Sequence, residues 1–101
     1  MSKKRYIVLR FKGSDVGRER LSKLIEDHLN MVYGLVGSSK VNPEVVYFNR
    51  ERLTGVVRTT VEGVKLFRAM LALVGPLEGV HVRVVKVTGT LRKAKAIAKS
   101  I

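Results

Sequence analysis

The sequence of 101 residues predicts one α+β domain, residues 1–101, whose elements follow the order β-α-β-β-α-β and end in a basic tail. Two patterns predict this order. Short segments of alternating apolar and polar residues indicate strands, and longer segments with apolar residues three and four positions apart indicate helices. The apolar content of 46% at this length suits a single hydrophobic core without disulfide or metal support.

The first strand is predicted over Arg5–Lys12, where apolar side chains alternate. Gly13–Asp15 interrupts the alternation and offers side chains that cap a helix. The first helix is expected to follow and to end near Gly34 or Gly37, because glycine commonly terminates helices. The segment from there to Pro43 is predicted as a loop, since the residue before a proline disfavours helix.

A hairpin and a second helix come next. Glu44–Asn49 and Thr54–Thr59 are predicted strands joined by a polar turn. Thr59 and Glu62 stand three residues apart, which is the spacing of a capping box at a helix start. The helix that begins there is expected to run to Val74, before Gly75 and Pro76.

The last strand is predicted over Val80–Val87, and the basic tail Thr90–Ile101 has apolar residues at helical spacing. The full order is the split βαβ arrangement of ferredoxin-like folds, which RNA-recognition (RRM-like) modules share with small enzymes. We expect an antiparallel sheet with both central helices on one face. The other face is predicted to be open to a partner.

The net charge of +12 is concentrated at the two ends of the chain. Residues 1–12 contribute +5 and residues 83–101 contribute +6, whereas residues 13–82 contribute only +1. A polyanionic partner is the natural explanation, and RNA, DNA and an anionic membrane surface all qualify. The alternative is charge that only keeps the chain soluble.

Several classes of protein are excluded or disfavoured. The chain has no cysteine, which excludes a disulfide framework and a cysteine nucleophile and is compatible with a reducing compartment. No apolar run reaches the roughly 18 residues that span a bilayer. Because Met1–Arg5 leads directly into a strand, we expect no signal peptide, no membrane association and a cytoplasmic location.

Basic side chains are predicted to surround the open face of the sheet. Strand alternation places Arg10, Arg58 and Arg83 there, and guanidinium groups match phosphate oxygens. The alternative is a row of solvated edge residues, because a register slip of one residue inverts a face. The third strand has no aromatic residue for base stacking, so contacts with phosphates and RNA shape fit better. The residues predicted to bind RNA are Lys3, Lys4, Arg5, Arg10, Lys12, Arg58, Arg83, Lys86, Arg92, Lys93 and Lys95.

The second helix is apolar almost all round, with Leu66, Met70 and Leu73 on a second face. We predict that a protein partner docks on this face; alternatively, the first helix and the tail helix cover it.

No catalytic or metal site is predicted. His28 and His81 are isolated, and no pair of carboxylates lies in an apolar context. The loop Gly13–Arg18 loosely resembles the phosphate-binding loop of acylphosphatases, which share the fold. Asp15 would repel an anion there, and the Val-Gln-Gly-Val sequence of that family is missing. A small phosphate-handling enzyme is therefore kept only as an alternative.

The segment Thr88–Lys95, Thr-Gly-Thr-Leu-Arg-Lys-Ala-Lys, resembles the Ser-Gly-Thr-Ile-Arg-Lys-Ala ending of the small protein-subunit family of ribonuclease P/MRP, especially its archaeal members. Three other segments agree with the same family: Arg5–Ile7, Met31–Gly37 and Gly55–Thr59. Together they extend, in order, over nearly the whole chain.

The resemblance implies an RNA-binding subunit of the endoribonuclease that removes 5′ leaders from precursor tRNA. It implies that the RNA is the catalyst, using Mg²⁺, and that the protein binds no cofactor and has no catalytic residue. The implied partners are ribonuclease P RNA, precursor tRNA, a TIM-barrel-like protein subunit and a second such protein pair in a heterotetramer. Tyr33 and Leu35 then join the second helix as candidate protein contacts. Another basic ribonucleoprotein component is the remaining alternative.

Overall fold

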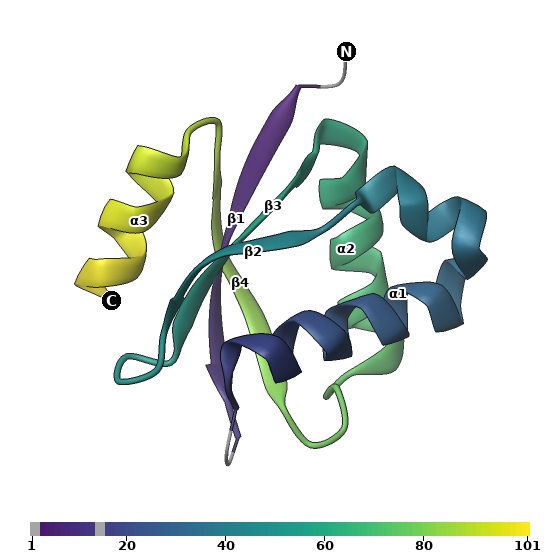
Figure 1. Ribbon diagram of the computed structural model, residues 1–101, viewed down its shortest axis with the longest axis horizontal. Helices are drawn as coiled ribbons and strands as arrows, with labels where there is room; N and C mark the ends of the chain where they lie inside the picture. The colour runs from purple at the N-terminus through teal and green to yellow at the C-terminus, as the bar shows by residue number, and fades with distance from the viewer. Residues whose placement is uncertain (1–2, 14–15) are drawn as a thin grey trace.

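Four strands form one antiparallel sheet in the order β2-β3-β1-β4 in the computed structural model, which describes residues 3–13 and 16–101. Three helices accompany the sheet, and the third of them forms the tail (Figure 1). The predicted ferredoxin-like order is confirmed. The elements are β1 (Lys4–Lys12), α1 (Arg18–Val41), β2 (Glu44–Asn49), β3 (Thr54–Thr60), α2 (Val61–Val74), β4 (His81–Thr88) and α3 (Leu91–Ser100).

The main core lies between the sheet and the helices α1 and α2. Strand β1 contributes Ile7, Leu9 and Phe11, which alternate as predicted, and α2 contributes Phe67 and Met70. Each fully buried apolar side chain of this size stabilises the fold by about 1.5–3 kcal/mol relative to its exposed state. The leucine and isoleucine side chains that α1 buries are Leu21, Leu24, Ile25 and Leu29.

Helix α1 is longer than predicted. Gly34 has a positive φ of 72° and interrupts the helix, but the chain resumes helical geometry and continues to Val41. Val41 is fully buried, and this burial holds the second helical segment on the core. Ser39 donates its hydroxyl to the backbone carbonyl of Val36, so this polar side chain is hydrogen-bonded within the helix. The predicted loop over residues 37–41 was therefore wrong.

The start of α2 is shifted by one residue from the prediction. Thr60 is the N-cap, and its Oγ1 accepts a hydrogen bond of 2.9 Å from the backbone N–H of Gly63. Thr59, the predicted cap, is buried and donates its hydroxyl to the carbonyl of Val41 instead. The end of the helix at Val74, followed by Gly75 with φ of 64°, confirms the prediction.

Strands β1 and β4 pair with a bulge. Val84 lies opposite Leu9 and Lys86 lies opposite Val8, so Val85 is an additional residue in β4. As a result, Val84 packs on the main core and Val85 on the opposite face of the sheet. A bulge of this kind bends a strand and redirects its side chains.

Candidate nucleic-acid interface

Helix α3 covers the sheet face that was predicted to be open. Its residues Ala94 and Ala98 are fully buried against Val8 of β1 and Val56 of β3. The side chains at the margin of this second cluster are Tyr6, Val46, Tyr47, Val85, Leu91, Ile97 and Ile101. The prediction of an open face was wrong, because the apolar row along its centre needs a cover and the tail supplies it.

Polar bonds fix both ends of α3. At its start, Thr90 is the N-cap and accepts a hydrogen bond of 3.3 Å from the N–H of Lys93. Near its end, Thr54 of β3 donates its hydroxyl to the carbonyl of Ala98 at 3.1 Å, and Arg52 donates to the carbonyl of Ile101. The helix therefore has one orientation on the sheet.

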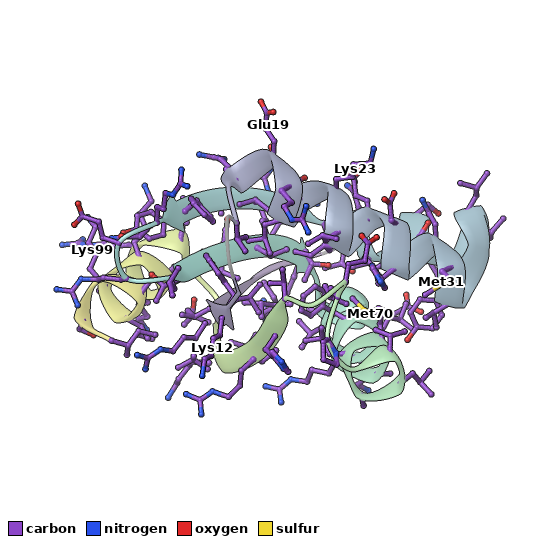
Figure 2. The ribbon with its side chains drawn as sticks, turned by 90° about the horizontal axis from the view of Figure 1, so that it is seen from below. Lys12, Glu19, Lys23, Met31, Met70 and Lys99 are labelled. Carbon is purple, nitrogen blue, oxygen red and sulfur yellow. The ribbon has the colours of Figure 1, made fainter. Side chains whose placement is uncertain are left out.

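This orientation directs the basic side chains of the tail outward. Arg92, Lys93 and Lys99 are exposed and Lys95 is partly exposed, whereas Ala94 and Ala98 face the sheet and are buried. In Figure 2, Lys99 lies at the end of the molecule that α3 occupies, far from Met31 at the opposite end. The tail is a cationic surface built on a rigid helix.

A second group of cations lies beside the last turn of α3. Arg10 of β1 stands directly opposite Arg83 of β4, and Lys12 stands opposite His81. Thr54, which holds Ala98, is the neighbour of Arg10 on the other side of β1. These residues border a groove of about 440 Å³ lined by Arg10, Phe11, Lys12, His81, Val82 and Arg83. We call α3 together with Arg10, Lys12, Arg83 and Lys86 the α3 surface.

Arg58 does not join the α3 surface as a free guanidinium. It lies on the same sheet face, opposite Tyr6, but it forms an ion pair with Glu44 on the neighbouring strand. Its guanidinium is already hydrogen-bonded to a carboxylate. An RNA phosphate would have to compete with the Glu44 carboxylate for Arg58, whose role as an RNA contact stays a prediction.

Lys3, Lys4 and Arg5 lie at the opposite end of β1 from Arg10 and Lys12. Arg5 is partly buried and donates to the carbonyl of Lys4. Residues 10–12 pair with the start of β4, at Arg83, whereas residues 3–5 lie at the end of β1 where Tyr6 pairs with Thr88 and β4 leads into α3. Lys3 and Lys4 instead share a groove with Lys40 and Lys65, two lysines that the sequence analysis did not select because they are distant in sequence.

The residues predicted as a protein interface separate into two groups. Met70 is fully buried, and Leu66 is half-buried beneath Tyr33, whose hydroxyl donates to the carbonyl of Leu66 at 2.7 Å. Met70 is core, because α1 packs against this side of α2. Of the two helices in the alternative, α1 covers Met70, whereas the tail helix α3 lies on the opposite face of the sheet. Leu35 and Leu73 are exposed, at 80% and 72%.

The described residues contain no group of three or more His, Asp or Glu side chains that could hold a metal ion. None of their helices is long and apolar enough to cross a membrane. Ser14 and Asp15, the centre of the glycine loop compared with acylphosphatases, lie outside the described residues.

Fold and surface together define a class, namely small ferredoxin-like domains that present a rigid cationic helix. The sequence model of the Rpp14/Pop5 family matches residues 5–99. The chain therefore belongs to the Rpp14/Pop5 family of ribonuclease P/MRP subunits.

Two known proteins illustrate the relationship. The chain is 36% identical over 89 residues to the ribonuclease P/MRP protein subunit POP5 of Schizosaccharomyces pombe. The matched region covers 84% of this chain and 64% of that protein. The chain thus spans less than two thirds of the length of this curated relative. A chain in the cryo-EM structure of yeast ribonuclease MRP has a TM-score of 0.65 at 12% identity, covering 99% of this chain and 88% of that one. At this identity the second likeness concerns the fold.

Proposed function

We propose that this protein is an RNA-binding subunit of ribonuclease P, of the type of the archaeal protein component 2, and that it supports the catalytic RNA during removal of 5′ leaders from precursor tRNA. The observation that carries the proposal is the start of α3. The segment that resembles the ribonuclease P family places Thr90 at the helix cap and buries Ala94, while Arg92 and Lys93 are exposed. The motif therefore builds a cationic helix.

The proposed mechanism is electrostatic. Side chains of the α3 surface neutralise RNA phosphates and release condensed counterions, which favours the folded, active shape of the RNA. The chemistry of cleavage belongs to the RNA and its Mg²⁺. The partners are ribonuclease P RNA, precursor tRNA and a TIM-barrel-like protein subunit in a heterotetramer, in the cytoplasm.

The role of α3 is tested with the double variant Arg92→Ala/Lys93→Ala. The slope of log affinity for a ribonuclease P RNA transcript against log salt concentration should fall by about 1–2 units, since each phosphate contact contributes roughly 0.7–0.9. The matched control, Arg20→Ala/Lys23→Ala, removes two exposed charges from α1 and should keep the wild-type slope. Equal slopes for the wild type and the α3 variant would refute the assigned role.

The identity of the RNA is tested by isolating the tagged full chain from its native source. We expect ribonuclease P RNA and a TIM-barrel-like subunit in the complex. Recovery of a different RNA would favour another ribonucleoprotein. Turnover of an acyl phosphate by the isolated protein would support the enzyme alternative instead.

A further inference from the structure

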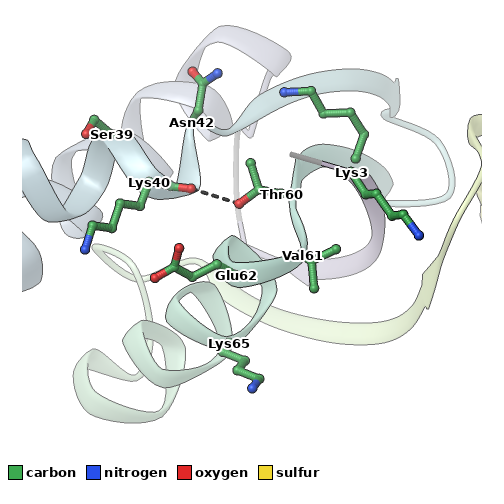
Figure 3. A pocket seen from close by; sticks show the side chains of 9 residues that line it. Lys3, Ser39, Lys40, Asn42, Thr60, Val61, Glu62 and Lys65 are labelled. Atoms are coloured by element: carbon green, nitrogen blue, oxygen red, sulfur yellow. Dashed lines mark hydrogen bonds between the residues drawn. The ribbon is translucent and has the colours of Figure 1, made fainter. Parts of the chain in front are cut away.

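Three elements meet at one corner of the molecule, on the opposite end of β1 from Arg10. The N–H of Val61, the first residue of α2, donates to the carbonyl of Lys3 at 3.3 Å. Thr60 donates its hydroxyl to the carbonyl of Lys40, in the last turn of α1, at 2.9 Å (Figure 3). These two hydrogen bonds hold the start of β1, the end of α1 and the start of α2 in a fixed arrangement.

The corner forms an open groove of about 770 Å³. Lys3, Lys4, Lys40 and Lys65 line it and are all exposed, and Glu62 is the single carboxylate in its lining. Over residues 3–13 and 16–101, none of these four lysines forms an ion pair. The four lysines and Glu62 together give the groove a net charge of +3. We call it the lysine groove.

The α2 dipole adds to the positive potential of the lysine groove. The groove surrounds the first turns of α2, where the helix macrodipole is positive, and Lys65 lies in the second turn of that helix. Lys40 interacts favourably with the C-terminal end of α1, but Lys3, Lys4 and Lys65 have no such partner. An anion in the groove would relieve the repulsion among the lysines and between the lysines and the α2 dipole.

The groove is suited to a chain of phosphates. Lysine ammonium groups on flexible stems act as point charges, in contrast to arginine, which binds one phosphate or carboxylate with paired hydrogen bonds. The groove is open and its cations come from separate elements, so it can follow an extended backbone. Given that the partner of the α3 surface is RNA, as proposed above, we infer that the lysine groove is a second, separate contact for the RNA sugar–phosphate backbone.

The two contacts lie on opposite faces of the sheet. Strand β1 extends from Lys4 at the lysine groove to Lys12, about 26 Å at 3.3 Å per residue, so its length separates the groove from Arg10, Lys12 and Arg83. The start of α3 follows Thr88, which pairs with Tyr6, and is separated from the groove by the sheet itself. The groove lies beside α1 and α2, whereas α3 lies on the other face of the sheet. An RNA that engages both must extend around the end and edge of the sheet, so the lysine groove adds to the footprint of α3.

The inference is tested with Lys40→Gln/Lys65→Gln, with a folded tRNA transcript as the probe. The salt slope should fall by about 1–2 units, and affinity at fixed low salt should fall roughly ten-fold. Arg20→Gln/Lys23→Gln is the control with the same charge change and should bind as the wild type. Combined with Arg92→Ala/Lys93→Ala, the losses should add, because distant sites contribute independently.

Substitution of Glu62 should change RNA affinity in the opposite direction to substitution of the lysines. Glu62→Gln removes the one carboxylate among the described lining residues and should tighten tRNA binding by about two- to five-fold, the effect expected of one exposed charge. The same change loses a favourable charge at the N-terminus of α2 and should slightly lower stability. A purely structural role for the lysines predicts no gain in RNA affinity, so an unchanged affinity would contradict the inference.

The outcomes separate the two proposals. If the α3 variant loses affinity for tRNA and the groove variant does not, the inference fails and the proposed function stands. If the wild type itself does not bind tRNA, both fail. If the groove variant loses binding to poly-L-glutamate but keeps tRNA binding, the groove accepts an acidic polypeptide and the inference is overturned.

Discussion

Met70 and Leu73 stand three residues apart on α2, and they occupy very different environments. Met70 is completely buried, whereas the side chain of Leu73 is 72% exposed. Both lie on the helix face that the sequence predicted as a protein interface. Helix α1 packs over one flank of α2 and stops short of the other, so the interface candidates reduce to exposed residues such as Leu73.

Truncation distinguishes the two side chains. Met70→Ala should lower the free energy of unfolding by about 2–5 kcal/mol, because it removes buried surface and leaves a cavity. Leu73→Ala should change it by less than about 0.5 kcal/mol, as expected at an exposed position. Urea denaturation followed by circular dichroism measures both. Similar effects of the two changes would contradict the assignment of Met70 to the core.

Arg10 and Arg83 form a like-charge pair across neighbouring strands. Such a pair destabilises a free sheet, so Arg83→Gln should stabilise the isolated protein by about 0.2–1 kcal/mol at low salt. The gain should shrink as salt screens the repulsion. Thermal unfolding at low and high salt measures it, with Arg83→Lys as the control that keeps the charge. The same Gln variant should bind RNA more weakly, and a loss of stability would contradict the paired arrangement.

At the scale of elements, α3 covers an apolar face of the sheet and replaces it with a cationic surface. Its small residues Ala94 and Ala98 allow close approach to Val8 and Val56, and hydrogen bonds from Thr54 and Arg52 fix its C-terminal end. A ferredoxin-like sheet without this helix would expose that apolar row. With it, the same face presents lysine and arginine side chains on a rigid support.

The cap of α3 is a local stability element. Thr90→Ala should destabilise α3 by about 0.5–2 kcal/mol through loss of the side-chain acceptor. Hydrogen exchange should become faster at the amides of residues 91–100, while α1 and α2 keep their protection because α3 packs on the opposite sheet face. Uniformly faster exchange over the whole chain would instead show that α3 unfolds only with the complete domain.

At the scale of the whole molecule, the net charge of +12 opposes compaction. Added salt should raise the melting temperature of the free protein by several degrees between low and physiological ionic strength, because screening weakens this repulsion. The combined variant Arg92→Gln/Lys93→Gln/Lys40→Gln/Lys65→Gln should show a smaller rise. A melting temperature independent of salt would contradict an electrostatic penalty in the free state.

Much of the fold follows from local pattern. The bounds of β2, the end of α2 before Gly75 and the alternation of Ile7, Leu9 and Phe11 were predicted correctly because each depends on neighbouring residues. Strand alternation also accounts for Tyr47 and Phe48, which lie on opposite faces of the sheet, with Phe48 stacked on Phe11 at a centroid distance of 5.3 Å.

Other features depend on residues distant in sequence. Thr59 has the spacing of a cap, but the carbonyl of Val41 takes its hydroxyl, so Thr60 caps α2. The sequence after Gly34 is typical of a loop, yet it is helical to Val41, because Val41 is buried in the core. Tertiary packing overrides local propensity both at the cap of α2 and in the segment after Gly34.

The sequence by itself determined the order of the elements, the concentration of positive charge at both ends and the family resemblance, because periodicity, composition and motif are properties of neighbouring residues. Tertiary structure alone decided which cations act together. Antiparallel pairing of β1 with β4 joins Arg10 to Arg83, and the length of β1 separates them from Lys3 and Lys4. The same packing brings Lys40 and Lys65 to that far end, since side chains distant in sequence share a surface only after the chain has folded.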